Sequence, residues 1–271
     1  MEIKYLSDSY EKIAKSSDLE FGKNIIPLTA DNNLLSNSSL LNEKGYGLFA
    51  LPDYKTFERL NEYITRYVLE RFMEYQKTIP THFTLSEYHH LLESEAVHYK
   101  ISTWALDYKM LGDVYYDIQH QAEEMLQLKL KVKKINHMGV EGEYIGFRIL
   151  RPLKNDHNPF HRDAWIPYWR ETVNIWLPIC GFEDGNTLQL IPQSHLWNDD
   201  EILKTKAGME QGGKKYHVPA AIGTVNKFSI ETPVLQQGEG IIFSPYLVHG
   251  NGVNRKKDVT RVSLEFRFCR R

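Results

Sequence analysis

The stretch TVNIWLPIC at residues 172–180 places valine, isoleucine, leucine and isoleucine at alternate positions. Side chains alternate between the two faces of a β-strand, so this spacing predicts a strand with one face on an apolar core. The same period of two occurs in EYIGFRIL (143–150) and VTRVSLEFRF (259–268). Three further segments, TLQLIP, TVNKFSIET and GEGIIF, continue the series between Gly, Pro, Asn and Asp residues. The chain from about residue 131 onward is therefore predicted to form several antiparallel strands.

The first part of the chain follows a helical period instead. Residues 53–78 carry apolar side chains three and four positions apart, and Asp53 is the expected N-cap. A capping box at Thr84–Glu87 predicts a short second helix through about residue 98, and residues 104–128 predict a third. These elements indicate an α+β fold in which helices within residues 1–130 buttress an antiparallel sandwich or barrel of the jelly-roll kind.

Two details of this organisation bear on function. Residues 196–223 interrupt the strands with little periodicity and several lysines, so we expect a lid-like insertion within one domain spanning residues 1–271. His89 and His90 are neighbours in the second predicted helix, so we expect their side chains to point apart and not to form a metal-binding pair.

Composition narrows the class of protein. The 271 residues have a formal net charge of -2, which gives no electrostatic reason to expect nucleic acid or an anionic membrane as partner. No apolar run approaches the roughly 20 residues that span a bilayer. The opening MEIKYLSDSYEK has no secretory pattern, and two cysteines make no disulfide framework, so a cytoplasmic protein acting on a small molecule is expected. The oligomeric state is not determined by the sequence.

A candidate metal site begins with His161 and Asp163. If they lie on a strand, residues two apart share a face, and both side chains could reach one ion. A surface histidine beside a surface acid is the alternative, and the pair alone does not decide between them. His249 follows the apolar segment GEGIIFSPYLVHG and offers a third ligand from a distant strand. Two imidazoles and a carboxylate occupy three adjacent positions on iron(II) and leave others open, although zinc could bind the same donors.

A candidate anion site follows on the strand VTRVSLEFRF. Arg261 and Ser263 share one face, which continues to Glu265 and Arg267. A guanidinium and a hydroxyl that point together into a barrel can bind a carboxylate. The alternative is a solvated outer face, and the twelve-residue spacing from His249 favours the binding role.

These motifs together resemble those of the iron(II)- and 2-oxoglutarate-dependent oxygenase superfamily. The segment GNTLQLIPQSH at residues 185–195 is similar to the Asn-Gly…Pro-Gly-Ser-His stretch of its phytanoyl-CoA dioxygenase-like branch, with Gln193 in place of glycine. We expect His195 in this segment to be a structural turn residue rather than a fourth ligand. The motif order that carries the resemblance is His161-x-Asp163, then His249, then Arg261-x-Ser263.

The resemblance implies a double-stranded β-helix and a specific chemistry. By analogy with the family, His161, Asp163 and His249 would bind iron(II), while Arg261 and Ser263 would hold the distal carboxylate of 2-oxoglutarate. Reaction with O2 would release succinate and CO2 and hydroxylate a C–H bond of the substrate. Two readings from other classes remain open: a cupin-like metal-dependent isomerase or lyase, and an inactive barrel that serves as a binding protein.

The remaining candidates line the predicted cavity. Asn174 and Arg148 lie on the polar faces of their strands and are candidates for contact with 2-oxoglutarate. The substrate is expected to be a carbohydrate or nucleotide sugar, an amino-acid derivative or a natural-product intermediate. Its candidate contacts are Trp165, Trp176, Lys214, Lys215 and Arg267. For Trp176, packing between sheets is an equally acceptable role.

Overall fold

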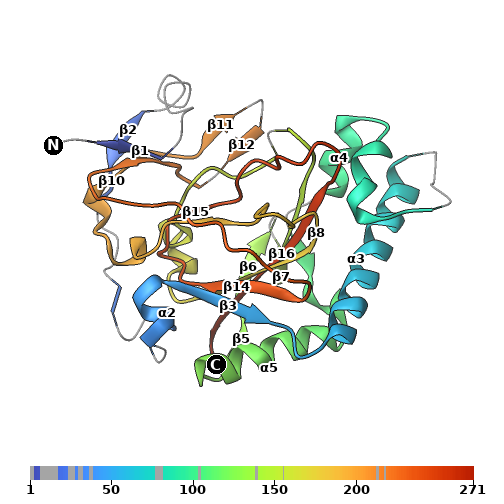
Figure 1. The fold of residues 1–271 in the computed structure, drawn as a ribbon, viewed down its shortest axis with the longest axis horizontal. Coiled ribbons are helices and arrows are strands. Elements are labelled where there is room, and N and C mark those ends of the chain that lie inside the picture. The colour runs from blue at the N-terminus through green and yellow to red at the C-terminus, as the bar shows by residue number, and fades with distance from the viewer. Residues whose placement is uncertain are drawn as a thin grey trace.

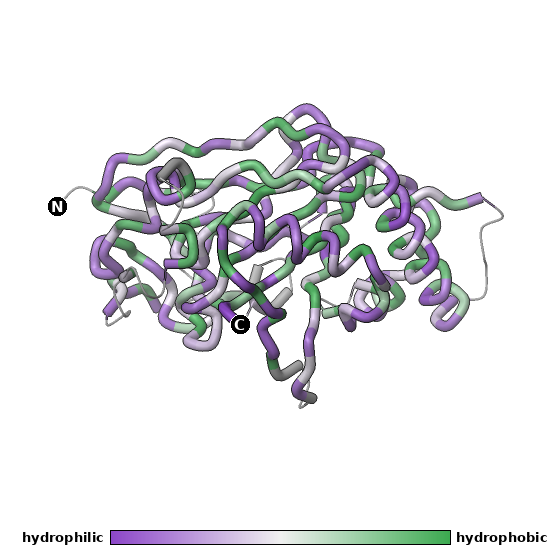
Figure 2. The backbone as a smooth tube through the Cα atoms, turned by 90° about the horizontal axis from the view of Figure 1, so that it is seen from below, coloured by the Kyte–Doolittle hydropathy of each residue, from purple (hydrophilic) through white to green (hydrophobic). Residues whose placement is uncertain are grey.

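The computed structural model describes residues 3–6, 18–23, 28–29, 33–36, 39–76, 82–102, 105–137, 140–154, 156–211, 214–216 and 218–271. Polar and apolar residues interleave along the whole of this chain (Figure 2). Among the helices in these ranges, none has the length and apolar character needed to cross a bilayer.

One large antiparallel sheet forms the framework (Figure 1). Its strands run in the order β3 (Tyr46–Ala50), β14 (Glu239–Phe243), β8 (Val173–Cys180), β16 (Arg261–Arg270), β7 (Val140–Leu150) and β4 (Ala105–Asp107). Two more strands complete it, with β5 (Leu130–Val132) paired to β16 and β6 (Lys134–His137) paired to β7. The strands predicted from the period of two at 143–150, 172–180 and 259–268 are thus confirmed.

Smaller sheets lie on the other side of the molecule. One has the order β1 (Lys4–Tyr5), β13 (Ala221–Thr224), β10 (Ile202–Thr205) and β2 (Leu19–Phe21). Two pairs accompany it: β9 (Gln189–Leu190) with β15 (His249–Gly250), and β11 (Met209–Gln211) with β12 (Lys214–Tyr216). Together with the helices, these antiparallel sheets confirm the predicted α+β class.

Within the described residues, the α-helices all lie in the first half of the chain. They are α2 (Ser39–Lys44), α3 (Tyr54–Tyr75), α4 (Glu95–Ile101) and α5 (Val114–Leu126), with 3-10 turns η1 (Leu85–His90) and η2 (Tyr108–Leu111). Four further 3-10 turns lie in the second half: η3 (Asp163–Trp165), η4 (Pro167–Trp169), η5 (Ser194–Leu196) and η6 (Asp199–Glu201). The Asp53 carboxylate accepts a hydrogen bond of 2.7 Å from the Thr56 amide, so the predicted cap of α3 is confirmed.

The other two predicted helices were wrong in extent. Thr84 makes no N-cap bond to the backbone, and an α-helix begins only at Glu95, where the Ser94 hydroxyl accepts from the Val97 amide. The region predicted as the start of the third helix forms β4 and η2 instead. Gly112 then takes a φ of 55°, which ends η2 and delays α5 to Val114. Apolar spacing persisted across this break, so the period alone did not reveal it.

Two expectations about the later loops also need correction. The stretch 196–223, expected to be irregular, contains the last residue of η5, all of η6, β10, β11 and β12, and most of β13. The predicted strand TVNKFSIET contributes only Thr224 to β13 and an isolated bridge between Glu231 and Leu190. Short strands of two to four residues give too few alternations for the sequence to reveal them.

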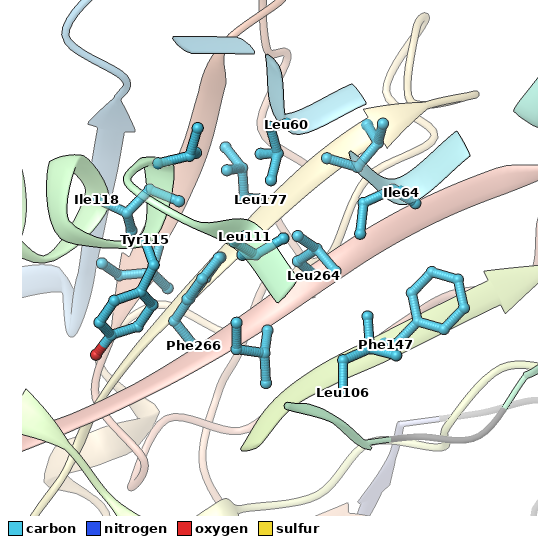
Figure 3. Packing of buried hydrophobic residues seen from close by; sticks show 14 of the residues in the cluster. Leu60, Ile64, Leu106, Leu111, Tyr115, Ile118, Phe147, Leu177, Leu264 and Phe266 are labelled. Atoms are coloured by element: carbon cyan, nitrogen blue, oxygen red, sulfur yellow. The ribbon is translucent and has the colours of Figure 1, made fainter. Parts of the chain in front are cut away.

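The main core lies between the helices and the outer face of the large sheet. Leu60 and Ile64 of α3 and Ile118 of α5 meet Leu177 of β8 and Leu264 of β16 there (Figure 3). Because adjacent residues point to opposite faces of a strand, this packing turns the polar residues of β16 to the inner face. The helices therefore fix which side of the sheet can carry a functional site.

Candidate metal centre and anion pocket

Three buried side chains converge on the inner side of the large sheet. His161 and His249 exchange backbone hydrogen bonds of 2.8 and 3.0 Å in an isolated antiparallel bridge, and their ring centroids are 4.4 Å apart. Asp163 Oδ1 lies 3.3 Å from His161 Nε2. One potential donor atom from each of the three residues lies within 4.8 Å of the others. The sequence motif therefore does bring the three predicted side chains together.

The way they meet differs from the expectation of a shared strand. His161 belongs to an isolated bridge, and the chain turns into η3 at Asp163. The Ala164 amide donates to the Pro245 carbonyl at 2.9 Å, which ties this turn to the segment before His249. A tight turn, rather than strand alternation, brings the carboxylate back toward the imidazoles.

Both histidines present the same nitrogen to the centre. His161 Nδ1 lies 2.8 Å from the Pro159 carbonyl, and His249 Nδ1 lies 3.0 Å from the Leu247 carbonyl. A carbonyl oxygen only accepts, so each Nδ1 carries the hydrogen and each Nε2 offers a lone pair. Burial, with the neighbouring His161, lowers the pKa of His249 to about 3, which keeps its ring neutral as a metal ligand requires.

The two oxygens of Asp163 are in different environments. Oδ2 accepts from Asn174 Nδ2 at 2.8 Å and from Arg267 Nη2 at 2.9 Å. Oδ1 is buried and has no hydrogen-bond partner among the described residues. Burial opposes ionisation, but the Arg267 guanidinium holds the pKa of Asp163 well below its usual value. One oxygen of an ionised carboxylate thus faces the two imidazole nitrogens without a donor of its own.

Arg267, expected to contact substrate, is engaged with protein groups in this structure. Its guanidinium binds Asp163 and also donates to Glu265 Oε1 at 2.7 Å. The same group lies 4.1 Å from the ring centroid of Trp169. Asn174, expected near 2-oxoglutarate, likewise binds Asp163. Both residues hold the carboxylate in place from behind.

This donor set fits a divalent transition metal. Two neutral imidazoles and one carboxylate oxygen are suited to iron(II), and three protein ligands leave coordination positions open. A buried carboxylate oxygen without a hydrogen-bond donor, such as Oδ1 of Asp163, is suited to bind a metal ion.

Arg261 forms a second buried site further along β16. Nη1 donates to the carbonyls of Asn186 and Thr187 at 3.0 and 3.2 Å, and Nη2 donates to the carbonyl of Asn251. No carboxylate among the described residues lies within ion-pair distance of it, and its Nε is buried without a hydrogen-bond partner there. Burial lowers the pKa of Arg261 to about 9. A buried guanidinium surrounded only by neutral groups is a site where an anion would be stabilised.

Arg148 places a further cation on the inner face, beside Ser263. It is paired with Ser263 across β7 and β16, so both side chains lie on the inner face. Its Nε is buried without a hydrogen-bond partner among the described residues, although the rest of the side chain remains partly exposed. Burial lowers the pKa of Arg148, and Glu265 opposes that shift. The inner face therefore carries two guanidinium groups: Arg261, whose pKa is shifted by burial without a nearby charge, and Arg148, whose nearest charged groups are Glu265 and Arg267.

The tryptophans and lysines are distributed differently. Trp176 is fully buried on β8, and the Arg261 guanidinium lies 5.9 Å from its ring centroid. Trp165 is half-buried, and its Nε1 donates to Asp199 Oδ1 at 2.5 Å. Its ring centroid lies 5.6 Å from Lys204 Nζ. The side chains of Lys214 and Lys215 lie outside the described part of the structure, and their backbone forms β12.

Sequence analysis missed the residues that support the metal centre from the adjacent loop. Arg162, between the two predicted ligands, is buried and donates to the carbonyls of Ser194 and Trp197. Ser194 Oγ accepts from the Val248 amide at 2.8 Å, immediately before His249. The only sequence signal for Arg162 was its place inside the His-x-Asp motif.

Two remaining features of that loop follow the sequence more closely. Gln193 adopts a φ of 64°, the left-handed conformation that a glycine would favour at this position. His195 is buried, and its Nε2 lies 2.7 Å from the Asn42 carbonyl, which agrees with the expected structural role.

Comparison with known proteins places this arrangement in a family. A family model described as phytanoyl-CoA dioxygenase (PhyH) matches residues 113–262, more than half of the chain. None of the curated proteins has a sequence that matches significantly.

Three solved structures are similar to this chain. They are AviO1 from Streptomyces viridochromogenes Tue57 (14% identity, 89% of this chain and 96% of that chain, TM-score 0.47); the epimerase SnoN in complex with Fe3+, alpha ketoglutarate and nogalamycin RO (14%, 88% and 83%, 0.50); and EctD from S. alaskensis with 2-oxoglutarate and 5-hydroxyectoine (14%, 93% and 84%, 0.48). At these identities the likeness to SnoN concerns the fold alone, and it agrees with the predicted double-stranded β-helix. With more than half of its length matched by the family model, the chain belongs to the phytanoyl-CoA dioxygenase family of iron(II)- and 2-oxoglutarate-dependent oxygenases.

Proposed function

We propose that this protein is an iron(II)- and 2-oxoglutarate-dependent dioxygenase that hydroxylates a polar small molecule, with His161, Asp163 and His249 as the iron ligands. The observation that carries the proposal is the buried Oδ1 of Asp163, which faces two imidazoles and has no hydrogen-bond donor among the described residues. An inactive barrel would gain nothing from keeping this arrangement, because a buried unsatisfied carboxylate oxygen destabilises the fold. Bound iron would supply the activation of O2 that these side chains cannot perform.

The protein's own groups have three tasks in this chemistry. The backbone carbonyls of Pro159 and Leu247 hold each imidazole with Nε2 toward the metal. Arg267 and Asn174 keep Asp163 ionised and orient it. The surrounding buried residues exclude bulk water, which protects a reactive oxidation from side reactions.

Arg261 and Ser263 are proposed to hold the distal carboxylate of 2-oxoglutarate. Arg261 Nε is available for a carboxylate oxygen, and Ser263 lies two residues along the same face. An isomerase or lyase of the cupin type would not need a buried guanidinium that lacks a counter-ion. The Arg261 pocket therefore favours the oxygenase over that alternative.

The charge of the site favours an anionic group on the primary substrate. Three arginines, Arg148, Arg261 and Arg267, and two carboxylates, Asp163 and Glu265, lie along the inner faces of β7 and β16 and at the metal centre. Iron(II) and the 2-oxoglutarate dianion cancel one another, so one positive charge remains. A carboxylate or phosphate on the substrate would neutralise it, with Arg148 as the nearest candidate partner.

The test is turnover of 2-oxoglutarate by protein reconstituted with iron(II) under anaerobic conditions and then exposed to O2. We expect succinate formation and O2 consumption, both lost in His161→Ala and His249→Ala. Incorporation of isotopically labelled oxygen into a product would identify hydroxylation. Succinate formation that persists unchanged in His249→Ala would rule out the proposed ligand set, and an absence of any 2-oxoglutarate consumption would favour the isomerase or the inactive barrel.

A further inference from the structure

A second cluster of metal-binding side chains lies outside the iron centre. His89 and His90 end η1, and Asp258 lies in the loop that leads into β16. The two histidines were expected to point apart, and this was wrong: their ring centroids are 3.9 Å apart and both rings turn toward Asp258. Contacts with the loop before β16 bring the two rings to the same place, since both lie against Asp258 and His89 also contacts Thr260.

The three donor atoms are arranged around one point. Asp258 Oδ1 lies 2.7 Å from His90 Nε2 and 3.3 Å from His89 Nε2. All three potential ligand atoms lie within 4.8 Å of one another. Zinc bonds of about 2.0–2.2 Å to nitrogen and oxygen need such donors roughly 3–3.5 Å apart. Small rotations of the exposed Asp258 and His90 side chains reach that spacing.

The His89 ring nitrogen that faces away from Asp258 has a hydrogen-bond partner, as is usual for a histidine that binds a metal. His89 Nδ1 lies 2.9 Å from the Thr260 hydroxyl, and the rest of the ring is largely buried. A hydrogen bond to one ring nitrogen fixes the ring and directs the other nitrogen toward a metal. Thr260 makes a second hydrogen bond to η1, since its backbone amide donates to the Ser86 carbonyl at 2.8 Å.

We propose that His89, His90 and Asp258 bind a zinc-class divalent ion. Two imidazoles and one carboxylate select zinc, nickel or cobalt over magnesium and calcium, which prefer oxygen ligands. The ion joins η1 to the loop before β16, directly ahead of Arg261. It therefore fixes the segment from which the anion pocket is built, and it does so independently of the iron centre.

Equilibrium dialysis of the purified protein against Zn2+ tests this site, with bound metal counted per chain. Zn2+ also suits the iron ligands, so we expect two equivalents in the wild type and one in His90→Ala and in Asp258→Asn. Both side chains are exposed, at 52% and 74%, so these variants should fold, and circular dichroism verifies this. The matched control is His120→Ala, which removes an exposed histidine of α5 paired with Glu124 and should leave zinc binding unchanged.

The outcomes separate this site from the iron centre. A loss of one equivalent in both variants but not in the control supports the second site, whatever the triad binds. Zinc stoichiometry and affinity that are the same in the wild type, His90→Ala and Asp258→Asn would overturn it. Thermal denaturation gives an independent measure, since Zn2+ should raise the Tm of His249→Ala protein and should no longer do so when Asp258→Asn is added.

Discussion

Removal of the Arg267 guanidinium is the most informative perturbation of the metal centre. Arg267 contacts Asp163 Oδ2 at 2.9 and 3.2 Å through two nitrogens and Glu265 at 2.7 Å, all buried. Arg267→Met keeps much of the aliphatic volume but leaves two buried carboxylates without their shared cation. Breaking a buried ion pair from one side costs about 3–5 kcal/mol, so we expect the free energy of unfolding of the metal-free protein to fall by that amount.

Urea denaturation followed by fluorescence measures this loss. The matched control is Arg59→Met, because Arg59 also contacts two carboxylates, Asp113 and Asp117, but on the surface. Exposed pairs contribute about 0–1 kcal/mol, so the control should change little. A loss in Arg267→Met no larger than that in Arg59→Met would refute the argument that Arg267 maintains the charge of Asp163.

The ion pair of Asp163 with Arg267 should also make the stability of the protein depend on pH. The pKa of Asp163 is lower in the folded protein than in the unfolded chain, where an aspartate has a pKa of about 3.9. Its contribution to stability is therefore present above about pH 4 and is lost as the pH falls through the folded pKa. In Arg267→Met the pKa of Asp163 rises, so this acid-labile part of the stability should shrink. Equal acid sensitivity in the two proteins would contradict it.

Three other predictions follow from the site and its surroundings. Arg261→Ala should raise the KM for 2-oxoglutarate by about 30-fold or more while iron binding persists, because a lost charge pair costs at least about 2 kcal/mol. The control is Arg255→Ala, since Arg255 is exposed. An unchanged KM in Arg261→Ala would show that Arg261 does not bind the 2-oxoglutarate carboxylate. Gln193→Gly should raise the free energy of unfolding by about 0.5–1 kcal/mol because φ is 64° at this position, whereas Gln193→Ala should not. Equal urea midpoints for the wild type and both variants would show that the turn is not strained. If residues 196–223 close over the substrate, limited proteolysis there should slow when substrate is added, and Lys214→Ala with Lys215→Ala should raise the KM for substrate but not for 2-oxoglutarate; cleavage indifferent to substrate would reduce the segment to a loop.

Much of the framework could be predicted because it depends on local periodicity. The alternation in residues 172–180 and 259–268 predicted β8 and β16, and the Asp53 cap predicted the start of α3. The second predicted helix was misread because Thr84 makes no N-cap bond, and the third because apolar spacing runs on through the break at Gly112. A backbone angle at one glycine leaves no trace in hydrophobic period.

The sequence by itself determined which residue types are available to bind a metal and an anion: two histidines and an aspartate in a recognisable order, followed by an arginine on a strand. Tertiary structure alone decided how they are supported. Arg267 meets Asp163 across 104 residues of chain, and Asp258 meets His89 across 169. The physical reason is that side-chain alternation follows from backbone geometry, whereas pairings between distant segments depend on how the sheets and turns pack. Burial lowers the pKa of His249 and of Arg261, while Arg267 lowers that of Asp163 against the effect of burial; burial and this distant pairing both exist only in the folded chain.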